Sequence, residues 1–126
     1  MRGYLLDTNV LIWELESHPR LEGPIRELFH SGAPCWVSIV SLWEMTIKAS
    51  LGKLQPLDPM LSTRLERAGF TLLPIDWMHL GYLQTLPHHH RDPFDRLLVA
   101  QAQAERLTIL TADRAILQYD VATRAA

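Results

Sequence analysis

The chain has 126 residues, of which 48% are hydrophobic, and this size and composition fit one compact domain with a single core. Charged residues make up 21% and form no long run of one sign, which argues against a disordered chain. The net charge of −2 argues against a protein that holds nucleic acid by bulk positive charge. A nucleic-acid substrate would have to be held by local basic residues and a metal ion.

The sequence gives no sign of export or of a membrane anchor. Cys35 is the only cysteine, so no internal disulfide can form, and its apolar neighbours predict a buried strand residue. The apolar stretch at residues 4–13 is interrupted by Asp7 and Asn9, and it is too short and too polar for a signal peptide or a membrane span. We therefore expect a cytoplasmic protein that does not contact a membrane.

Short apolar runs alternate with segments of helical spacing in the first half of the chain. Proline at a first helical position and glycine after a last turn help to set the bounds. The pattern predicts strands at residues 4–6 and 35–37, a helix at 10–16, a helix from Pro24 that ends before Gly32, and a helix from Ser41 to Leu51.

The second half of the chain continues this alternation. It predicts a helix that opens at Asp58-Pro59 and runs towards Ala68, a strand at 70–75 and a helix capped by Asp76. A polar loop at 87–91 precedes the longest predicted helix, which runs from Asp92-Pro93 to near Glu105. A strand at 108–111, a short helix at 114–118 and a fifth strand at 119–121 complete the pattern. We expect the residues after Val121 to be frayed.

This alternation favours an α/β fold in which a parallel central sheet of four or five strands is flanked by helices on both faces. No internal repeat or linker interrupts the pattern, so we expect residues 1–126 to form a single domain. In such a sheet, ligands bind outside the carboxyl ends of the strands. Residues at those ends are therefore the first candidates for a functional site.

Four acidic residues stand where an apolar run meets the start of a helix. Asp7 and Asp113 directly follow predicted strands, whereas Glu44 and Asp95 lie in the first turns of helices that can converge on the same edge. Carboxylates gathered at one point repel one another unless a cation joins them. Oxygen ligands without cysteine partners suit Mg²⁺, with Mn²⁺ as an alternative, better than zinc.

Asp7 and Asp113 also have a purely structural interpretation. Either residue can cap the helix that follows it, which is a common role for aspartate. The hydroxyl of Thr8 and the amide of Asn9 can equally orient Asp7 or a metal-bound water. The case for a site rests on all four acids falling at one edge of the predicted sheet.

Glu44 has two structural alternatives. It can form a capping box with Ser41, or an ion pair with Lys48 four residues further on. Ile47 and Leu51 share its helix face, which predicts that Glu44 leans towards the protein interior. Cap and metal ligand both remain open for this residue.

Asp95 is a stronger ligand candidate, because it lies on the same helix face as the apolar residue Val99. An acid beside a buried stripe needs a partner, although the helix dipole also favours an acid in a first turn. Asp92 precedes Pro93 and is predicted to be the N-cap of this helix. Whether Asp92 also binds a metal through water is left open.

The histidines at residues 88–90 are predicted to lie in an exposed loop, because three adjacent histidines cannot all face one ion on a regular element. Together with Arg91 they could contact phosphates or stack on bases. Four basic residues are candidates for phosphate contacts, and the structural alternative for each is an ordinary solvated surface position: Arg91, Arg96, Lys48 and Lys53. We favour solvated surface for Lys53.

Four segments together resemble the PIN-domain ribonucleases, and among them the VapC-type toxins of bacterial toxin–antitoxin pairs. They are residues 4–9, 38–44, 92–98 and 110–113, and their order and spacing carry the resemblance. The resemblance covers nearly the whole chain and implies a parallel sheet with flanking helices. It also implies a homodimer that cuts RNA with Mg²⁺ or Mn²⁺ and is blocked by a cognate antitoxin.

The resemblance assigns a role to each candidate residue. It implies that the family's acidic quartet is formed by Asp7, Glu44, Asp95 and Asp113, with support from Thr8 or from the hydroxyl of Ser38 or Ser41. Thr8, Asn9 and Ser38 are also expected to contact the substrate. In the resulting hypothesis, the metal ion activates a water for attack on an RNA phosphorus.

Two other classes of function remain as alternatives. A phosphate-accepting signalling domain of receiver type needs a lysine at a strand end, and the predicted strand ends offer none. A domain of the same fold that only binds RNA or a protein gains nothing from the mutual repulsion of four acids. Only an assay separates this second alternative from a nuclease.

Overall fold

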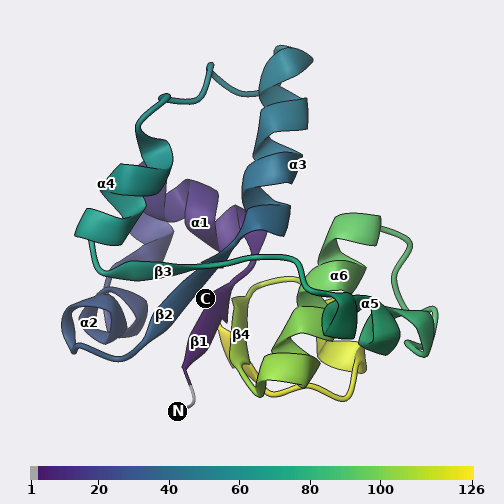
Figure 1. The fold of residues 1–126 in the computed structure, drawn as a ribbon. Coiled ribbons are helices and arrows are strands. Elements are labelled where there is room, and N and C mark those ends of the chain that lie inside the picture. Colours follow the sequence, from purple (N-terminus) through teal and green to yellow (C-terminus); the bar gives the residue numbers. More distant parts are fainter. Residues whose placement is uncertain (1–2) are drawn as a thin grey trace.

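In the computed structural model, which describes residues 3–126, five strands form one sheet in which every neighbouring pair is parallel (Figure 1). The strands stand in the order β3-β2-β1-β4-β5, so the first strand of the chain is the central one. Their bounds are β1 Tyr4–Leu6, β2 Cys35–Ser38, β3 Phe70–Leu73, β4 Thr108–Thr111 and β5 Thr123–Ala125. The predicted α/β fold with a parallel sheet is confirmed.

Helices cover both faces of the sheet. They are α1 Thr8–Leu15, α2 Pro24–His30, α3 Ile39–Ser50, α4 Leu61–Arg67, α5 Trp77–Gln84 and α6 Pro93–Glu105, with short 3₁₀ helices η1 Pro19–Leu21 and η2 Ile116–Gln118. α1, α2 and α4 pack on one face, and α5 and α6 pack on the other (Figure 1). Within residues 3–126, none of these helices has the length and apolar character needed to cross a membrane.

The two central strands supply both hydrophobic cores. Leu5 and Ile109 are fully buried against α5 and α6, whereas their neighbours Leu6 and Leu110 are fully buried against α1, α2 and α4. This division follows from the strand repeat, because successive side chains of a strand point to opposite faces. The apolar run of each central strand is therefore explained by burial on both sides.

The strand order also determines where a ligand can bind. From β1 the chain adds β2 and β3 on one side, and it then returns to add β4 and β5 on the other side of β1. The direction of winding therefore reverses between β1 and β4. In sheets of this kind the connections diverge at such a point and leave a crevice outside the carboxyl ends of the two strands.

Two helices begin earlier than the sequence predicts. α3 begins at Ile39 because Ser38 is its N-cap, and the Oγ of Ser38 accepts a hydrogen bond from the N–H of Val40 at 3.0 Å. The prediction that Ser41 opens this helix is wrong, and Ser41 is a fully buried residue of its first turn. α1 likewise begins at Thr8 rather than at residue 10.

Three further boundaries differ from the prediction. β3 ends at Leu73, because Pro74 has no N–H to continue a strand ladder. α4 begins at Leu61, after a turn that follows the predicted start at residues 58–59. The fifth strand is β5 at 123–125 and not residues 119–121, so the prediction of a frayed tail is also wrong.

A buried polar network joins α3 to α6, the helices that carry two of the candidate acids. Gln101 of α6 is fully buried, and its Oε1 accepts a hydrogen bond from the hydroxyl of Ser38 at 2.5 Å. Its Nε2 donates to the carbonyl of Pro74 at 3.2 Å. Because buried polar groups without partners are costly, this network holds the start of α3 in a defined position against α6.

Candidate functional site

The four candidate acids come together in the crevice outside the carboxyl ends of β1 and β4. Asp7 follows β1, Asp113 follows β4, and α3 and α6 contribute Glu44 and Asp95. The charges of Glu44 and Asp113 act on both Asp7 and Asp95, so the four carboxylates lie within electrostatic reach of one another. We call these four residues the acidic cluster.

Asp7 is held in place from two directions. It is only 3% exposed, and its Oδ1 accepts a hydrogen bond from the N–H of Val10 at 2.8 Å, so it caps α1 as the structural interpretation predicts. Its Oδ2 accepts a hydrogen bond from the hydroxyl of Thr111. The Oγ1 of Thr111 also accepts a hydrogen bond from the N–H of Asp113 at 2.9 Å. One threonine thus connects Asp7 and Asp113, the acids that follow β1 and β4.

Glu44 lies in the second turn of α3 and forms no capping box with Ser41, which removes that structural alternative. Its inward orientation has a different cause from the predicted one, because Ile47 and Leu51 are themselves exposed. Glu44 is only 8% exposed, and its Oε2 pairs with the Nζ of Lys48 at 3.2 Å. Its Oε1 is buried and has no hydrogen-bond partner.

Asp92 and Asp95 have different tasks at the start of α6. Asp92 is the N-cap, and its Oδ1 accepts hydrogen bonds from the N–H groups of Phe94 and Asp95 at 2.8 and 3.2 Å. The side chain of Asp95 takes no part in capping. Its Oδ2 instead lies 3.0 Å from the Nε2 of His90.

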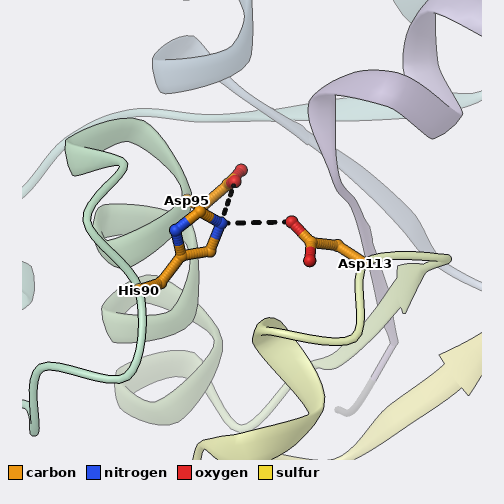
Figure 2. A group of neighbouring side chains, drawn as sticks. All are labelled: His90, Asp95 and Asp113. Carbon is orange, nitrogen blue, oxygen red and sulfur yellow. Dashed lines mark hydrogen bonds and ion pairs between the residues drawn. The ribbon is translucent and has the colours of Figure 1, made fainter.

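His90 lies between two members of the acidic cluster, as Figure 2 shows. Its Nε2 is 3.0 Å from the Oδ2 of Asp95 and 3.1 Å from the Oδ2 of Asp113. The prediction that residues 88–90 form only an exposed loop is therefore wrong for His90. The backbone N–H of His90 also donates to the hydroxyl of Tyr119 at 2.9 Å, which fixes the loop against η2.

The other ring nitrogen of His90 determines what Nε2 can do. The Nδ1 accepts a hydrogen bond from the N–H of Asp92 at 3.1 Å, which places the ring proton on Nε2. Nε2–H is thus a donor to the carboxylates of Asp95 and Asp113. A histidine that binds a metal through Nε2 usually donates its other ring N–H to an acceptor, and Asp92 offers a donor there instead. This arrangement favours the carboxylates, rather than His90, as metal ligands.

Burial and neighbouring charges raise the pKa of two members of the cluster. For Asp7, burial is the largest cause that raises the pKa above 3.8, and the negative charges of Asp113 and Glu44 add to it. For Asp95, burial comes first and the charge of Asp92 second, and together with smaller effects they raise the pKa to about 7. A cation in the crevice would stabilise the charged form of both carboxylates.

The predicted supporting residues take different positions. The hydroxyl of Thr8 is buried and donates to the Oγ of Ser41 at 3.0 Å. Ser38 has no exposed surface and is used by the α3 cap and by Gln101, a position that does not support its predicted contact with a substrate. Asn9 is exposed at the rim of the crevice, where it lines a cavity with members of the cluster.

Of the predicted phosphate contacts, Arg96 is engaged within the protein, whereas Arg91 is exposed. The guanidinium of Arg96 donates to the carbonyl of Pro87 at 2.8 Å and to the hydroxyl of Tyr119 at 3.2 Å, so it holds the polar loop against the body of the protein. Arg91 is exposed and lines a cavity of about 710 Å³ together with His88. Arg91 thus remains accessible to a substrate.

The donor set of the cluster fits a hard divalent cation. Glu44 presents a buried carboxylate oxygen that lacks any partner, and such an acceptor is costly unless a donor or a cation reaches it. The Oδ2 atoms of Asp95 and Asp113 already converge on one donor atom. Several carboxylate oxygens without a thiolate are the ligands preferred by Mg²⁺ and Mn²⁺.

The fold and this site agree with a known class of protein. The sequence profile of the PIN domain matches residues 4–122. Because this match spans nearly all of the chain, the protein belongs to the PIN domain family. Among curated protein sequences, no significant match is found.

Solved structures with the same fold come from bacterial complexes. The chain is similar to one from VapBC2 of Rickettsia felis bound to a promoter DNA fragment, with a TM-score of 0.75, 18% identity, and coverage of 99% of this chain and 98% of the other. DNA-bound VapBC from Salmonella typhimurium gives a TM-score of 0.73, 18% identity, and coverage of 99% and 98%. FitAcB from Neisseria gonorrhoeae gives 0.64, 24% identity, and coverage of 95% of each chain. At these identities the likeness establishes the fold.

The raised pKa of Asp95 predicts a pH-dependent stability of the metal-free protein. An unfolded chain releases this proton near the ordinary value of 3.8, whereas the folded protein keeps it up to about 7. The folded state thus binds more protons in this window, and the free energy of unfolding falls as the pH rises through it. In thermal denaturation with EDTA at about pH 8, Asp95→Asn should be more stable than the wild type.

The matched control is Asp120→Asn, which changes an exposed aspartate outside the cluster. It should retain the pH dependence of the wild type, whereas Asp95→Asn should lose part of it. If Asp95→Asn and the wild type were equally stable at about pH 8, ionisation of Asp95 would not destabilise the folded protein, and the prediction would be wrong.

The tautomer of His90 predicts the sign of a change in metal affinity. Because Nε2–H occupies the carboxylate oxygens of Asp95 and Asp113, His90→Ala should strengthen Mn²⁺ binding, by roughly tenfold for one lost charge-assisted hydrogen bond. If His90 were a ligand, the same substitution would weaken binding. Isothermal titration calorimetry with Mn²⁺ measures the change, and His89→Ala, an exposed neighbour, is the control.

Proposed function

We propose that this chain is a Mg²⁺- or Mn²⁺-dependent endoribonuclease and the toxin of a toxin–antitoxin pair. The observation that carries the proposal is the convergence of four carboxylates, one with an unpartnered buried oxygen, outside the ends of β1 and β4. Two findings support it: PIN domain toxins are generally nucleases, and the structural neighbours include VapBC complexes.

In this proposal Asp7, Glu44, Asp95 and Asp113 hold the divalent ion. When bound, the ion would supply Lewis-acid chemistry, which would activate water and stabilise negative charge on the leaving oxygen. The protein contributes orientation: hydrogen bonds from Val10 and from Thr111 fix the Asp7 carboxylate before any ligand arrives. Pre-set geometry of this kind lowers the cost of reaching the transition state.

The reaction proposed is hydrolysis of an RNA phosphodiester. Water adds to the phosphorus, the bond to the 3′ oxygen breaks, and that oxygen takes up a proton, which leaves a 5′-phosphate and a 3′-hydroxyl. Asn9 is exposed and lines a cavity with members of the cluster, and Arg91 is exposed and lines a cavity with His90. Both are proposed to contact the RNA. Lys48 neutralises one oxygen of Glu44 and leaves the other free for the ion.

The remaining parts of the proposal concern the setting of the protein. We propose that residues 1–126 act as one PIN domain in the cytoplasm, as a homodimer that a cognate antitoxin inhibits. The similar structures include VapBC and FitAcB, and this supports the proposed antitoxin partner. The sequence alone gives the expectation of a cytoplasmic protein.

Removing single carboxylates tests the proposed nuclease. Asp7→Asn and Asp95→Asn keep the size and much of the hydrogen bonding of each residue, so the fold should persist, as checked by circular dichroism. Each variant should lose more than about 100-fold of the Mn²⁺-dependent cleavage of total RNA, since even residues that only support a metal ligand cost 10–100-fold. Cleavage is measured on protein purified free of bound antitoxin.

Asp120→Asn is the control, because it removes the same charge outside the cluster. It should cleave as well as the wild type and should need the same metal. If Asp7→Asn and Asp95→Asn both cut RNA as well as the wild type, the acidic cluster is not the nuclease site. If the wild type binds Mn²⁺ and RNA but cuts nothing, the chain is a binding domain of the same fold.

A further inference from the structure

A small cavity adjoins the acidic cluster on the side of α1. Its volume is about 280 Å³, and it is lined by Asp7, Asn9, Trp13, Arg20, Ala112 and Asp113. Two of these residues belong to the cluster, and one is a cation. Arg20 belongs to η1, which follows α1. No local feature of the sequence predicts that this residue lies beside the acidic cluster.

Arg20 is held by stacking rather than by an ion pair. Its guanidinium carbon lies 4.6 Å from the centroid of the Trp13 ring, within the range of a cation–π interaction. Its backbone N–H donates to the Nδ1 of His18 at 3.0 Å, which fixes the start of η1. Within residues 3–126, no carboxylate lies within ion-pair distance of Arg20.

Other basic residues of the described chain are engaged differently. Three of them form ion pairs with carboxylates: Arg26 with Glu14, Lys48 with Glu44, and Arg64 with Asp58. Arg96 is bound by backbone carbonyls and a tyrosine hydroxyl. Arg20 is therefore distinguished by two properties together: its charge is unpaired, and it lines a cavity with members of the acidic cluster.

We propose that Arg20, oriented by Trp13, binds a phosphate of the RNA strand next to the phosphodiester that the acidic cluster takes. This inference rests on the proposed function. An acidic crevice repels the RNA backbone, so a strand that enters it needs a cation beside the acids. The planar guanidinium suits two-pronged hydrogen bonding to phosphate oxygens. The cation–π contact with Trp13 uses none of the guanidinium N–H donors, which leaves them for such bonds.

Direct binding to RNA tests the proposal without relying on cleavage. The probe is a short fluorescein-labelled single-stranded RNA of mixed sequence, and EDTA prevents metal-dependent cutting. Fluorescence anisotropy gives the Kd at several salt concentrations for the wild type, Arg20→Ala and Arg20→Lys. Arg67→Ala is the control, because Arg67 is an exposed arginine of α4 that does not line this cavity.

Arg20→Ala should bind RNA several-fold more weakly than the wild type, and its salt slope should be smaller by about 0.7, the value for one phosphate contact to a single strand. Arg20→Lys should fall between the two, because lysine keeps the charge but loses the planar stack. Arg67→Ala should match the wild type. Each Arg20 variant should still bind Mn²⁺, which separates this role from one in the metal site.

Unchanged RNA affinity and salt slope in Arg20→Ala would overturn the proposal, and so would an equal loss in Arg67→Ala, which would indicate a general charge effect. Failure of the proposed function gives a different result. In that case the wild type itself would not cut RNA, and if it also did not bind RNA, the proposed role of Arg20 would be wrong as well. If the wild type cuts RNA but Arg20→Ala has a normal KM and Kd, only this inference fails.

Discussion

Four carboxylates share one crevice, and the free energy of holding them there is the constraint on which the rest of the structure depends. Burial penalises the charged forms of Asp7 and Asp95, and the charges of the neighbouring acids add to that penalty. Hydrogen bonds to Asp7, Lys48 beside Glu44, and the Nε2–H of His90 offset part of it. They leave one buried oxygen of Glu44 without a partner, which a divalent cation would satisfy.

The sheet topology creates this crevice. β1 and β4 are far apart in the sequence but adjacent in the sheet, so the residues that follow them, Asp7 and Asp113, meet at one edge. The direction of winding reverses between these strands, and this leaves a space at the sheet edge. Glu44 of α3 and Asp95 of α6 contribute their carboxylates there. The buried hydrogen bond between Ser38 and Gln101 then fixes those two helices against each other. Fold stability and site geometry thus rely on the same contacts.

Much of this site follows from local rules of sequence, and the rest depends on tertiary contacts. Asp7 and Asp113 could be placed because the carboxyl ends of parallel strands share an edge. Glu44 is buried as expected but for a different reason, since its helix begins at Ile39 and its expected apolar neighbours are exposed. His90 could not be placed, because its partners lie on α6 and beyond β4. The position of β5 could not be predicted from an apolar run, because this strand contains polar residues and pairs with only one neighbouring strand.

The most direct test of the central claim is a crystal structure of the protein grown or soaked with Mn²⁺, with anomalous diffraction used to locate the ion. The account predicts an anomalous peak inside the acidic cluster, bound by oxygens that include the Glu44 Oε1 now without a partner, and His90 turned away from Asp95 and Asp113. A crevice with no peak, or a peak bound only by residues elsewhere, would contradict the account.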